Sequence, residues 1–181
     1  MIIGITGTNG AGKGTVVEYL KSKGFAHGSG REFIFEEIRR RGMPLDRNST
    51  NIVGNDLREK YGPGYIAQEL MKRALAKKKD AVIESIRSVG EAEYLRSQGA
   101  TIWAVNADRK IRYERSVLRG SETDMISFEE FCEQEDRELN QKEKYDMNIL
   151  GVINMADAVL TNNGTQEELF AQVETALKKF S

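Results

Sequence analysis

Gly7-Thr8-Asn9-Gly10-Ala11-Gly12-Lys13-Gly14-Thr15 lies between an apolar run at residues 2–5 and an amphipathic helical pattern that ends near Gly24. The glycines allow a tight turn in which several backbone N–H groups surround one anion, and the positive end of the following helix points at the same place. Lys13 adds a mobile cation for the β- and γ-phosphates, and the hydroxyl of Thr15 suits Mg²⁺. This stretch therefore predicts a phosphate-binding loop, or P-loop, that holds a nucleoside triphosphate.

Short apolar runs and helical patterns alternate along the rest of the chain. The apolar runs are continuous, as in strands that are buried on both faces of a sheet, and they lie at residues 25–27, 81–83, 102–105 and 158–160. Helical patterns lie at 31–41, 52–60 and 65–77, after Asp108, and at three capping-box pairs: Ser88 with Glu91, Ser127 with Glu130, and Thr165 with Glu168. The alternation predicts an α/β chain with a three-layer P-loop NTPase fold, in which helices flank a central parallel sheet of about five strands.

Length and composition are those of a single globular domain that spans residues 1–181. The formal net charge of −1 gives no reason to expect nucleic acid or an anionic membrane as a partner. The apolar start, Met1–Ile5, is too short for a signal peptide or a membrane span. Cys132 is the single cysteine, which excludes a disulfide within the chain. We therefore expect a cytoplasmic monomer or homodimer that acts on a small molecule.

The P-loop departs from the general pattern, in which Ser or Thr follows the lysine directly. Gly14 takes that position, and Thr15 comes one residue later. This Gly-x-x-Gly-x-Gly-Lys-Gly-Thr form resembles the loop of adenylate kinase and other nucleoside monophosphate kinases. The loop alone does not separate such a kinase from a GTPase or a motor ATPase. The chain has no Asn/Thr-Lys-x-Asp segment of the kind that reads guanine in GTPases, which argues against GTP.

A second motif, Val82-Ile83-Glu84-Ser85-Ile86-Arg87, continues the apolar run at 81–83. It resembles the nucleoside monophosphate kinase segment in which a strand ends in an acidic residue, usually aspartate, with an arginine three positions later. On that resemblance Glu84 holds Mg²⁺ through water and Arg87 binds the acceptor phosphate, roles that suit a carboxylate and a guanidinium. The continuation at 88–96 resembles phage-type deoxynucleoside monophosphate kinases and archaeal dephospho-CoA kinase-like proteins. The alternative is a charged pair at the surface.

Arg115 and Arg119 are four positions apart and share one helix face. Such a pair after the fourth strand resembles the start of the lid of adenylate-type kinases, where the first arginine lies against adenine and the second reaches the phosphates. On the same resemblance residues 115–140 form a short lid, and Arg137, near its end, is a third lid arginine. All three arginines would stabilise charge during phosphoryl transfer. The alternative is a solvated helix face.

The acceptor-binding helices of these kinases correspond to residues 28–78 of this chain. The turn at Gly28–Glu32 loosely resembles the one that opens the acceptor site, and Arg31 and Arg58 are the first candidates for acceptor contacts. In the kinases that this chain resembles, the loop that corresponds to the one after residues 158–160 passes the adenine ring, which makes Asn163 a candidate contact. A plain turn without a ligand contact is an equal alternative. For His27 we expect a packing or surface role.

The sequence predicts ATP-dependent phosphoryl transfer, with Mg²⁺, onto a nucleoside or deoxynucleoside monophosphate. One alternative is a dephospho-CoA kinase-like enzyme that phosphorylates a ribose hydroxyl, with Asp46 or Asp56 as the carboxylate near the attacking oxygen. Another is a switch protein that hydrolyses ATP. Lys13 and Thr15 argue against a binding module without catalytic activity.

Overall fold

The computed structural model describes residues 1–77, 80–119, 126–139 and 147–181, and gives only the backbone of Arg47, Arg119, Gln134, Arg137 and Glu138. In chain order the elements are β1 (Ile2–Thr6), α1 (Lys13–Ser22), β2 (Ala26–Ser29), α2 (Gly30–Arg40), α3 (Arg47–Tyr61), α4 (Tyr65–Leu75), β3 (Ala81–Glu84), α5 (Val89–Ser97), β4 (Thr101–Asn106), α6 (Arg109–Arg119), α7 (Phe128–Leu139), α8 (Ile149–Asn154), β5 (Ala158–Thr161) and α9 (Gln166–Phe180).

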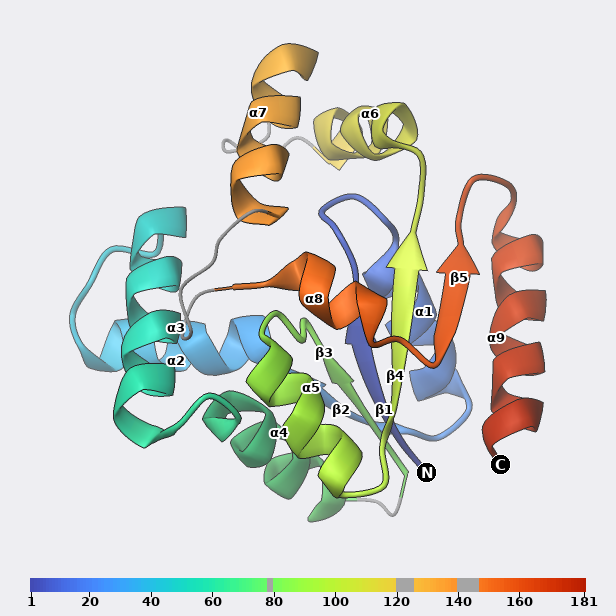
Figure 1. Ribbon diagram of the computed structural model, residues 1–181, viewed down its shortest axis with the longest axis horizontal. Helices are drawn as coiled ribbons and strands as arrows, with labels where there is room; N and C mark the ends of the chain where they lie inside the picture. Colours follow the sequence, from blue (N-terminus) through green and yellow to red (C-terminus); the bar gives the residue numbers. More distant parts are fainter. Residues whose placement is uncertain (78–79, 120–125, 140–146) are drawn as a thin grey trace.

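The five strands form one parallel sheet in the order β2-β3-β1-β4-β5. This confirms the predicted P-loop NTPase fold with its parallel sheet. β1 lies in the middle, so the P-loop that follows it is flanked by the carboxyl ends of β3 and β4. Ligands of open parallel sheets bind at those ends. Figure 1 shows α6 and α7 beyond the carboxyl ends of the strands.

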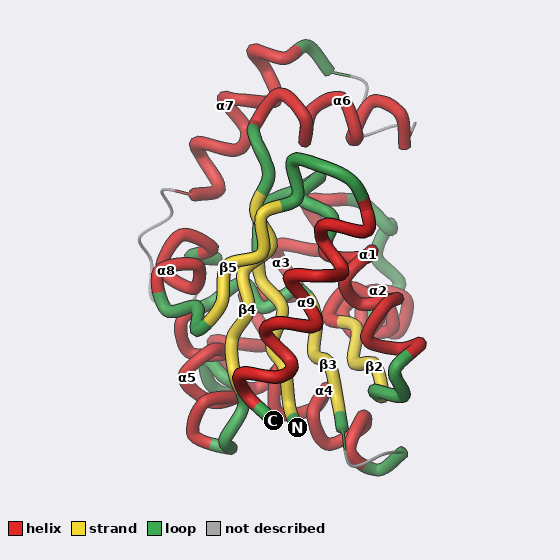
Figure 2. Tube along the Cα trace, turned by 90° about the vertical axis from the view of Figure 1, so that its right-hand side faces the viewer, coloured by secondary structure: helices red, strands yellow, loops and turns green. Residues whose placement is uncertain are grey.

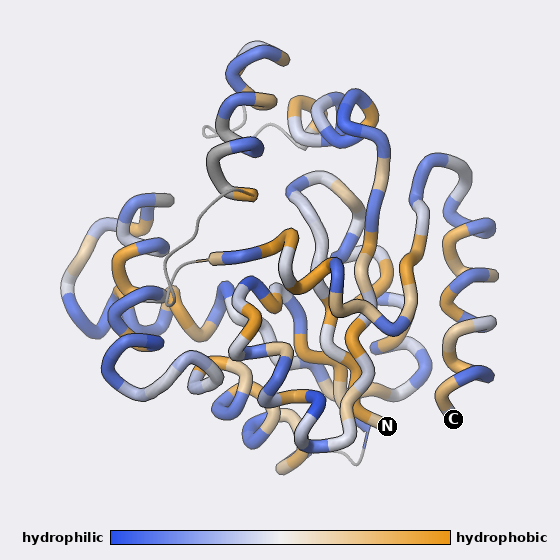
Figure 3. The backbone as a smooth tube through the Cα atoms, viewed as in Figure 1, coloured by the Kyte–Doolittle hydropathy of each residue, from blue (hydrophilic) through white to orange (hydrophobic). Residues whose placement is uncertain are grey.

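Helices cover both faces of the sheet (Figure 2). α1 and α9 pack on one face, and α4, α5 and α8 pack on the other. Each face has its own apolar cluster, for example around Leu20, Trp103 and Val173 on the first face and around Leu70 and Leu95 on the second. Hydrophobic residues accordingly concentrate along the strands (Figure 3). Strands that are covered on both faces explain why their sequences are continuous apolar runs.

The three predicted capping boxes are present at the starts of α5, α7 and α9. Two helices differ from the prediction. α3 begins before residue 52, because Asp46 accepts the N–H of Ser49 over 2.7 Å and caps a turn that looks merely polar in the sequence. α8 was not predicted, because Ile149–Asn154 is too short to show helical periodicity. Within the described ranges, no helix is long and apolar enough to cross a membrane.

Candidate functional site

The P-loop depends on glycines at the points where it passes other segments. Gly10 and Gly12 have φ angles of 75° and 97°, in the left-handed region. A Cβ at Gly10 would lie 2.4 Å from the carbonyl oxygen of Arg112, and one at Gly12 would lie 2.1 Å from Nδ2 of Asn162. Any larger residue would therefore push the loop away from α6 and from the loop after β5.

The start of α1 is built to receive an anion. Gly12 occupies the N-cap position and provides no side-chain acceptor for the N–H groups of the first turn. Nζ of Lys13 lies over the loop, where it donates to the carbonyl oxygens of Gly7 and Thr8 over 2.8 and 2.7 Å. Helix N–H groups and a lysine ammonium thus converge on the same space, which is the chemistry that phosphate requires.

Glu84 ends β3 beside the end of β2. Its Oε1 accepts from Oγ of Ser29 over 3.3 Å and lies 3.4 Å from Nε2 of His27. Burial acts to raise the pKa of Glu84. Contact with His27, then Ser29 and the charge of Lys13, outweigh burial, so the pKa lies below its ordinary value of 4.5. Glu84 is therefore an anion at neutral pH.

His27 is a residue whose position the sequence did not reveal. It was expected to have a packing or surface role, but the register of β2 on β3 places its imidazole against the Glu84 carboxylate. Nε2 is buried and makes no hydrogen bond of good geometry in the described part of the chain. At 3.4 Å the two atoms are farther apart than in an ordinary N–H···O bond.

The loop after Glu84 carries Arg87 and is held firmly. Ser85 has a φ of 65°, a strained conformation for a residue with a side chain. The N–H of Ile86 donates to Ile5 over 3.0 Å, and Oγ1 of Thr6 donates to the carbonyl of Ile86 over 2.9 Å. These bonds tie the loop to β1, so the Arg87 backbone begins beside the carboxyl end of β1, where the P-loop also starts.

Asn162, which follows β5, links the P-loop to α6. Its Nδ2 donates to the carbonyl of Ala11 over 2.9 Å, and its Oδ1 accepts from Nη2 of Arg115 over 3.4 Å. The neighbouring Asn163 accepts the N–H of Asp108 over 2.8 Å. Asn162 thus links Arg115 to the P-loop, whereas Asn163 bonds to the chain just before α6. The buried Asn162 was missed, and its only signal is a polar residue directly after a strand.

Asn162→Ala should weaken the contact between the P-loop and the loop after β5. The change removes the hydrogen bond to Ala11 and leaves a buried carbonyl without its donor, which costs about 1–3 kcal/mol of unfolding free energy. Because Gly12 and Ala11 lie in the P-loop, nucleotide affinity should fall as well. Thermal unfolding with and without ATP measures both effects. Gln172→Ala is the matched control, since its hydrogen-bond partner Thr161 lies outside the P-loop. Equal effects of the two changes would contradict this account.

Arg112 is not the solvated arginine that its helix suggests. It is 5% exposed, and Nε donates to the carbonyl of Ala107 over 2.8 Å. Nη2 donates to Glu135 of α7 over 2.9 Å. The buried pair fastens α7 to α6, and α6 in turn touches the P-loop at Gly10. The side chains of Arg119 and Arg137, two predicted site residues, lie outside the described residues.

Two predicted acceptor contacts have partners within the protein. Arg58 is 3% exposed and pairs with Glu91. Arg31 is exposed, and its guanidinium carbon lies 5.0 Å from the ring centre of Phe35 on the same helix. Arg58 therefore lies in the interior, and Arg31 lies on the surface of α2.

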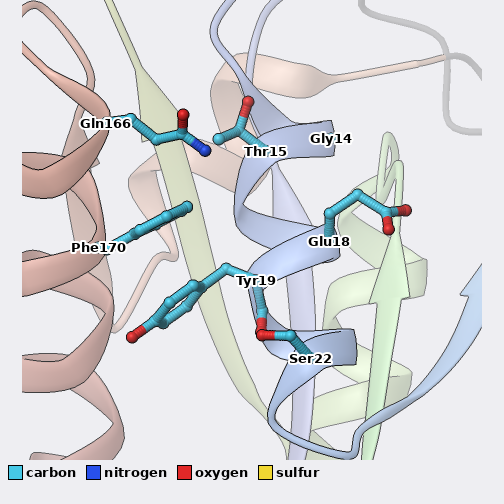
Figure 4. Close-up of a pocket in the computed structure, with 7 residues that line it drawn as sticks. All are labelled: Gly14, Thr15, Glu18, Tyr19, Ser22, Gln166 and Phe170. Carbon is cyan, nitrogen blue, oxygen red and sulfur yellow. The ribbon is translucent and has the colours of Figure 1, made fainter.

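An open hollow of about 480 Å³ runs along α1, from the last P-loop residues to Ser22, beside the start of α9 (Figure 4). Tyr19 and Phe170 stack at a centroid distance of 4.0 Å, and Gln166 lies near Thr15. The full lining consists of Gly14, Thr15, Glu18, Tyr19, Ser22, Gln166 and Phe170. An aromatic wall beside the last P-loop residues offers space for an uncharged ring.

No group of three or more His, Cys, Asp or Glu side chains gathers in the ranges that the structure describes. The protein therefore builds no closed metal cage in those ranges. A lone carboxylate next to a phosphate cradle fits Mg²⁺, which is usually held by one or two carboxylates and the phosphates of its nucleotide. Glu84 is placed for such a role.

Comparison with known proteins places these features in a family. A family model described as AAA domain matches residues 3–144. A UPF0200 protein of Pyrococcus abyssi is 32% identical over 186 residues, which cover 99% of this chain and 96% of that protein. The structure of shikimate kinase from Aquifex aeolicus matches with a TM-score of 0.55 and 18% identity, covering 99% of this chain and 97% of that one. Dephospho-CoA kinase from Campylobacter jejuni matches with a TM-score of 0.57 and 14% identity, covering 99% and 96%. At these identities the two structures show the fold alone.

Proposed function

The chain belongs to the UPF0200 family and carries a P-loop domain of the AAA type at residues 3–144, and from this premise we propose that it is an ATP-dependent kinase of a small, nucleotide-like acceptor. The P-loop domain implies nucleotide binding. The nature of the acceptor, the roles of single residues and the division into an acceptor segment and a lid are part of the proposal.

One observation carries the proposal: groups suited to a phosphoryl donor and to its acceptor lie at the ends of neighbouring strands. Lys13 and the start of α1 follow β1. Glu84 ends the adjacent β3, and Arg87 follows three residues later on a loop bonded to β1. Phosphoryl transfer depends mainly on positioning and on stabilising charge, so a lysine, a carboxylate and an arginine that follow neighbouring strands suit it.

The residues of the site fit MgATP. The P-loop N–H groups and Lys13 would hold the β- and γ-phosphates, while Thr15 and Glu84 would hold Mg²⁺ directly or through water. Mg²⁺ supplies neutralisation of the charge on the phosphate oxygens. Arg115, held by Asn162, and the hollow beside Thr15 would contact the nucleoside end of ATP.

Two features favour a phosphate acceptor over a hydroxyl acceptor. In the reaction, the bond from the γ-phosphorus to the ADP oxygen breaks as a bond to an acceptor oxygen forms. A hydroxyl acceptor must also lose a proton, whereas an ionised phosphate need not. The carboxylates considered for that proton have other partners, since Asp46 caps α3 and Asp56 pairs with Arg41. The depressed pKa of Glu84 makes it a weak proton acceptor and a good cation ligand.

An ADP-release assay with MgATP tests the proposal. The panel contains the common ribo- and deoxyribonucleoside monophosphates and dephospho-CoA. A strong response to one monophosphate supports the proposal and names the acceptor. A response to dephospho-CoA alone would support a hydroxyl acceptor and overturn the argument from Glu84. A slow ATPase that no acceptor accelerates would favour a switch protein.

Arg87→Ala should raise the KM of the acceptor far more than that of ATP, because the guanidinium is proposed to bind the acceptor phosphate. Loss of a charged hydrogen-bond partner corresponds to an increase of about 10- to 100-fold. Steady-state kinetics with each substrate varied in turn measure the two values. An equal rise in both would move Arg87 away from the acceptor side.

A further inference from the structure

A buried ion pair joins α3 to the helix that follows the Arg87 loop. Arg58 on α3 and Glu91 on α5 are 3% and 1% exposed, and Nε of Arg58 donates to Oε1 of Glu91 over 2.9 Å. Removing two charges from water is costly, and a well-packed apolar pair in such a place is often as stable or more stable. Stability alone therefore gives no reason for an ion pair here.

The second oxygen of Glu91 holds the Arg87 loop itself. Oε2 accepts the N–H of Arg87 over 2.9 Å and that of Ser88 over 3.2 Å. On the other side, Nη1 of Arg58 donates to Oδ1 of Asn55 over 3.2 Å. A continuous chain of hydrogen bonds thus runs from the side of α3, through Glu91, to the backbone of Arg87.

The same loop is already fixed to β1 on its amino-terminal side. Thr6 bonds to Ile86, and the strained Ser85 sets the direction in which the chain leaves β3. What these contacts leave open is the position of the loop relative to α3. Oγ of Ser88 donates to the carbonyl of Pro63, just after α3, over 3.3 Å, and Arg58 with Glu91 adds a charged bridge to α3 itself.

We propose that Arg58 and Glu91 are positioning residues that fix α3 relative to Arg87, so that an acceptor with an anionic group meets a preformed site. Arg58 acts through Arg87 rather than by touching the acceptor, which accounts for its burial. A site that is ordered in advance binds more tightly because less ordering is needed on binding. The inference rests on the proposed function in its assignment of Arg87 to the acceptor.

Two variants separate positioning from simple stability. Arg58→Met leaves the Glu91 charge buried without its partner, so both the Tm and the affinity for the acceptor should fall. In the double variant Arg58→Met with Glu91→Gln, no charge is left unpaired, and the amide oxygen of Gln still accepts the N–H groups of Arg87 and Ser88. Its Tm should return close to that of the wild type.

The acceptor KM of the double variant decides the matter. Because the double variant lacks the link to α3, we expect its acceptor KM to stay at least about tenfold above that of wild type, since small displacements of a binding group have large effects. Its KM for ATP should stay within about twofold of the wild-type value. Arg96→Met is the matched control, because Arg96 lies on the same helix and pairs with Asp157 away from the site. If the acceptor KM recovers together with the Tm, the pair is structural only and the proposal is overturned.

A second arm is independent of turnover. Inorganic phosphate is titrated into ¹⁵N-labelled protein, and the Nε–H signal of Arg87 is followed by NMR. The expected result is a phosphate-dependent shift in the wild type that needs at least about fivefold more phosphate in the double variant. If no acceptor gives turnover but this difference is found, the kinase proposal fails and the positioning role stands. A wild-type signal that does not respond to phosphate would overturn the positioning role.

Discussion

Lys13→Ala is expected to lower the kcat/KM of phosphoryl transfer by about 10²- to 10³-fold or more, which corresponds to about 3–4 kcal/mol of transition-state stabilisation. The ammonium group lies over the P-loop, within 2.8 Å of the carbonyls of Gly7 and Thr8, at the place where the β- and γ-phosphates would lie. At that place the ammonium charge would act directly on the negative charge that develops on the transferred group.

The control for this prediction is Lys21→Ala. Lys21 lies on the same helix, is exposed, and pairs with Glu18 one turn away, so its loss should leave the rate unchanged. Circular dichroism and the Tm check that Lys13→Ala remains folded, since the bonds to Gly7 and Thr8 are lost as well. A variant that is folded and keeps activity within about tenfold of wild type would show that Lys13 does not contact the transferred group.

Glu84→Gln is expected to lower kcat by about 10²-fold and to raise the Mg²⁺ concentration needed for half-maximal rate. The change keeps the size of the side chain and its bond to Ser29 but removes the charge. Titration of the rate with Mg²⁺ at saturating ATP measures the effect, and Glu93→Gln, at an exposed position of α5, is the control. An unaltered Mg²⁺ dependence would contradict the assignment of Glu84 as a metal ligand.

The same variant has a pH signature that needs no substrate. The pKa of Glu84 is lower in the folded protein than its ordinary value, so the ionised form stabilises the fold. That contribution is complete well above the ordinary pKa of 4.5 and is lost as the pH falls through the lower folded pKa. The unfolding free energy of wild type should therefore approach that of Glu84→Gln as the solution is acidified, which chemical denaturation at several pH values would measure.

The sheet and most helices were predictable because their signals are local. Continuous apolar runs at 81–83 and 102–105 indicated strands buried on both faces, and capping boxes located the starts of three helices. The start of α3 was missed because Asp46 is followed by polar residues, as a turn would be. Only the bond from Ser49 distinguishes a cap from a turn, and that bond exists in the fold rather than in the pattern.

Part of the candidate site was also predictable from local sequence, and part of it was not. The P-loop is one short segment, so its sequence carries its geometry. The contact of His27 with Glu84 depends on the register of β2 against β3, and the burial of Arg58 depends on the approach of α3 to α5. A single sequence carries no record of either approach. Arg58 was therefore interpreted as a ligand contact, although it forms a buried ion pair within the protein.

The strand order has a consequence for redesign. Because β1 lies between β3 and β4, the segments proposed for the acceptor and those proposed for the nucleoside end of ATP lie on opposite sides of the P-loop. Substitutions on the two sides share few partners, and free-energy changes at separated sites usually add. The two sides can therefore be changed separately. A library of substitutions confined to α2 and α3 can be screened for new acceptors while the ATP side stays constant. Improvements found on either side can then be combined without a second screen.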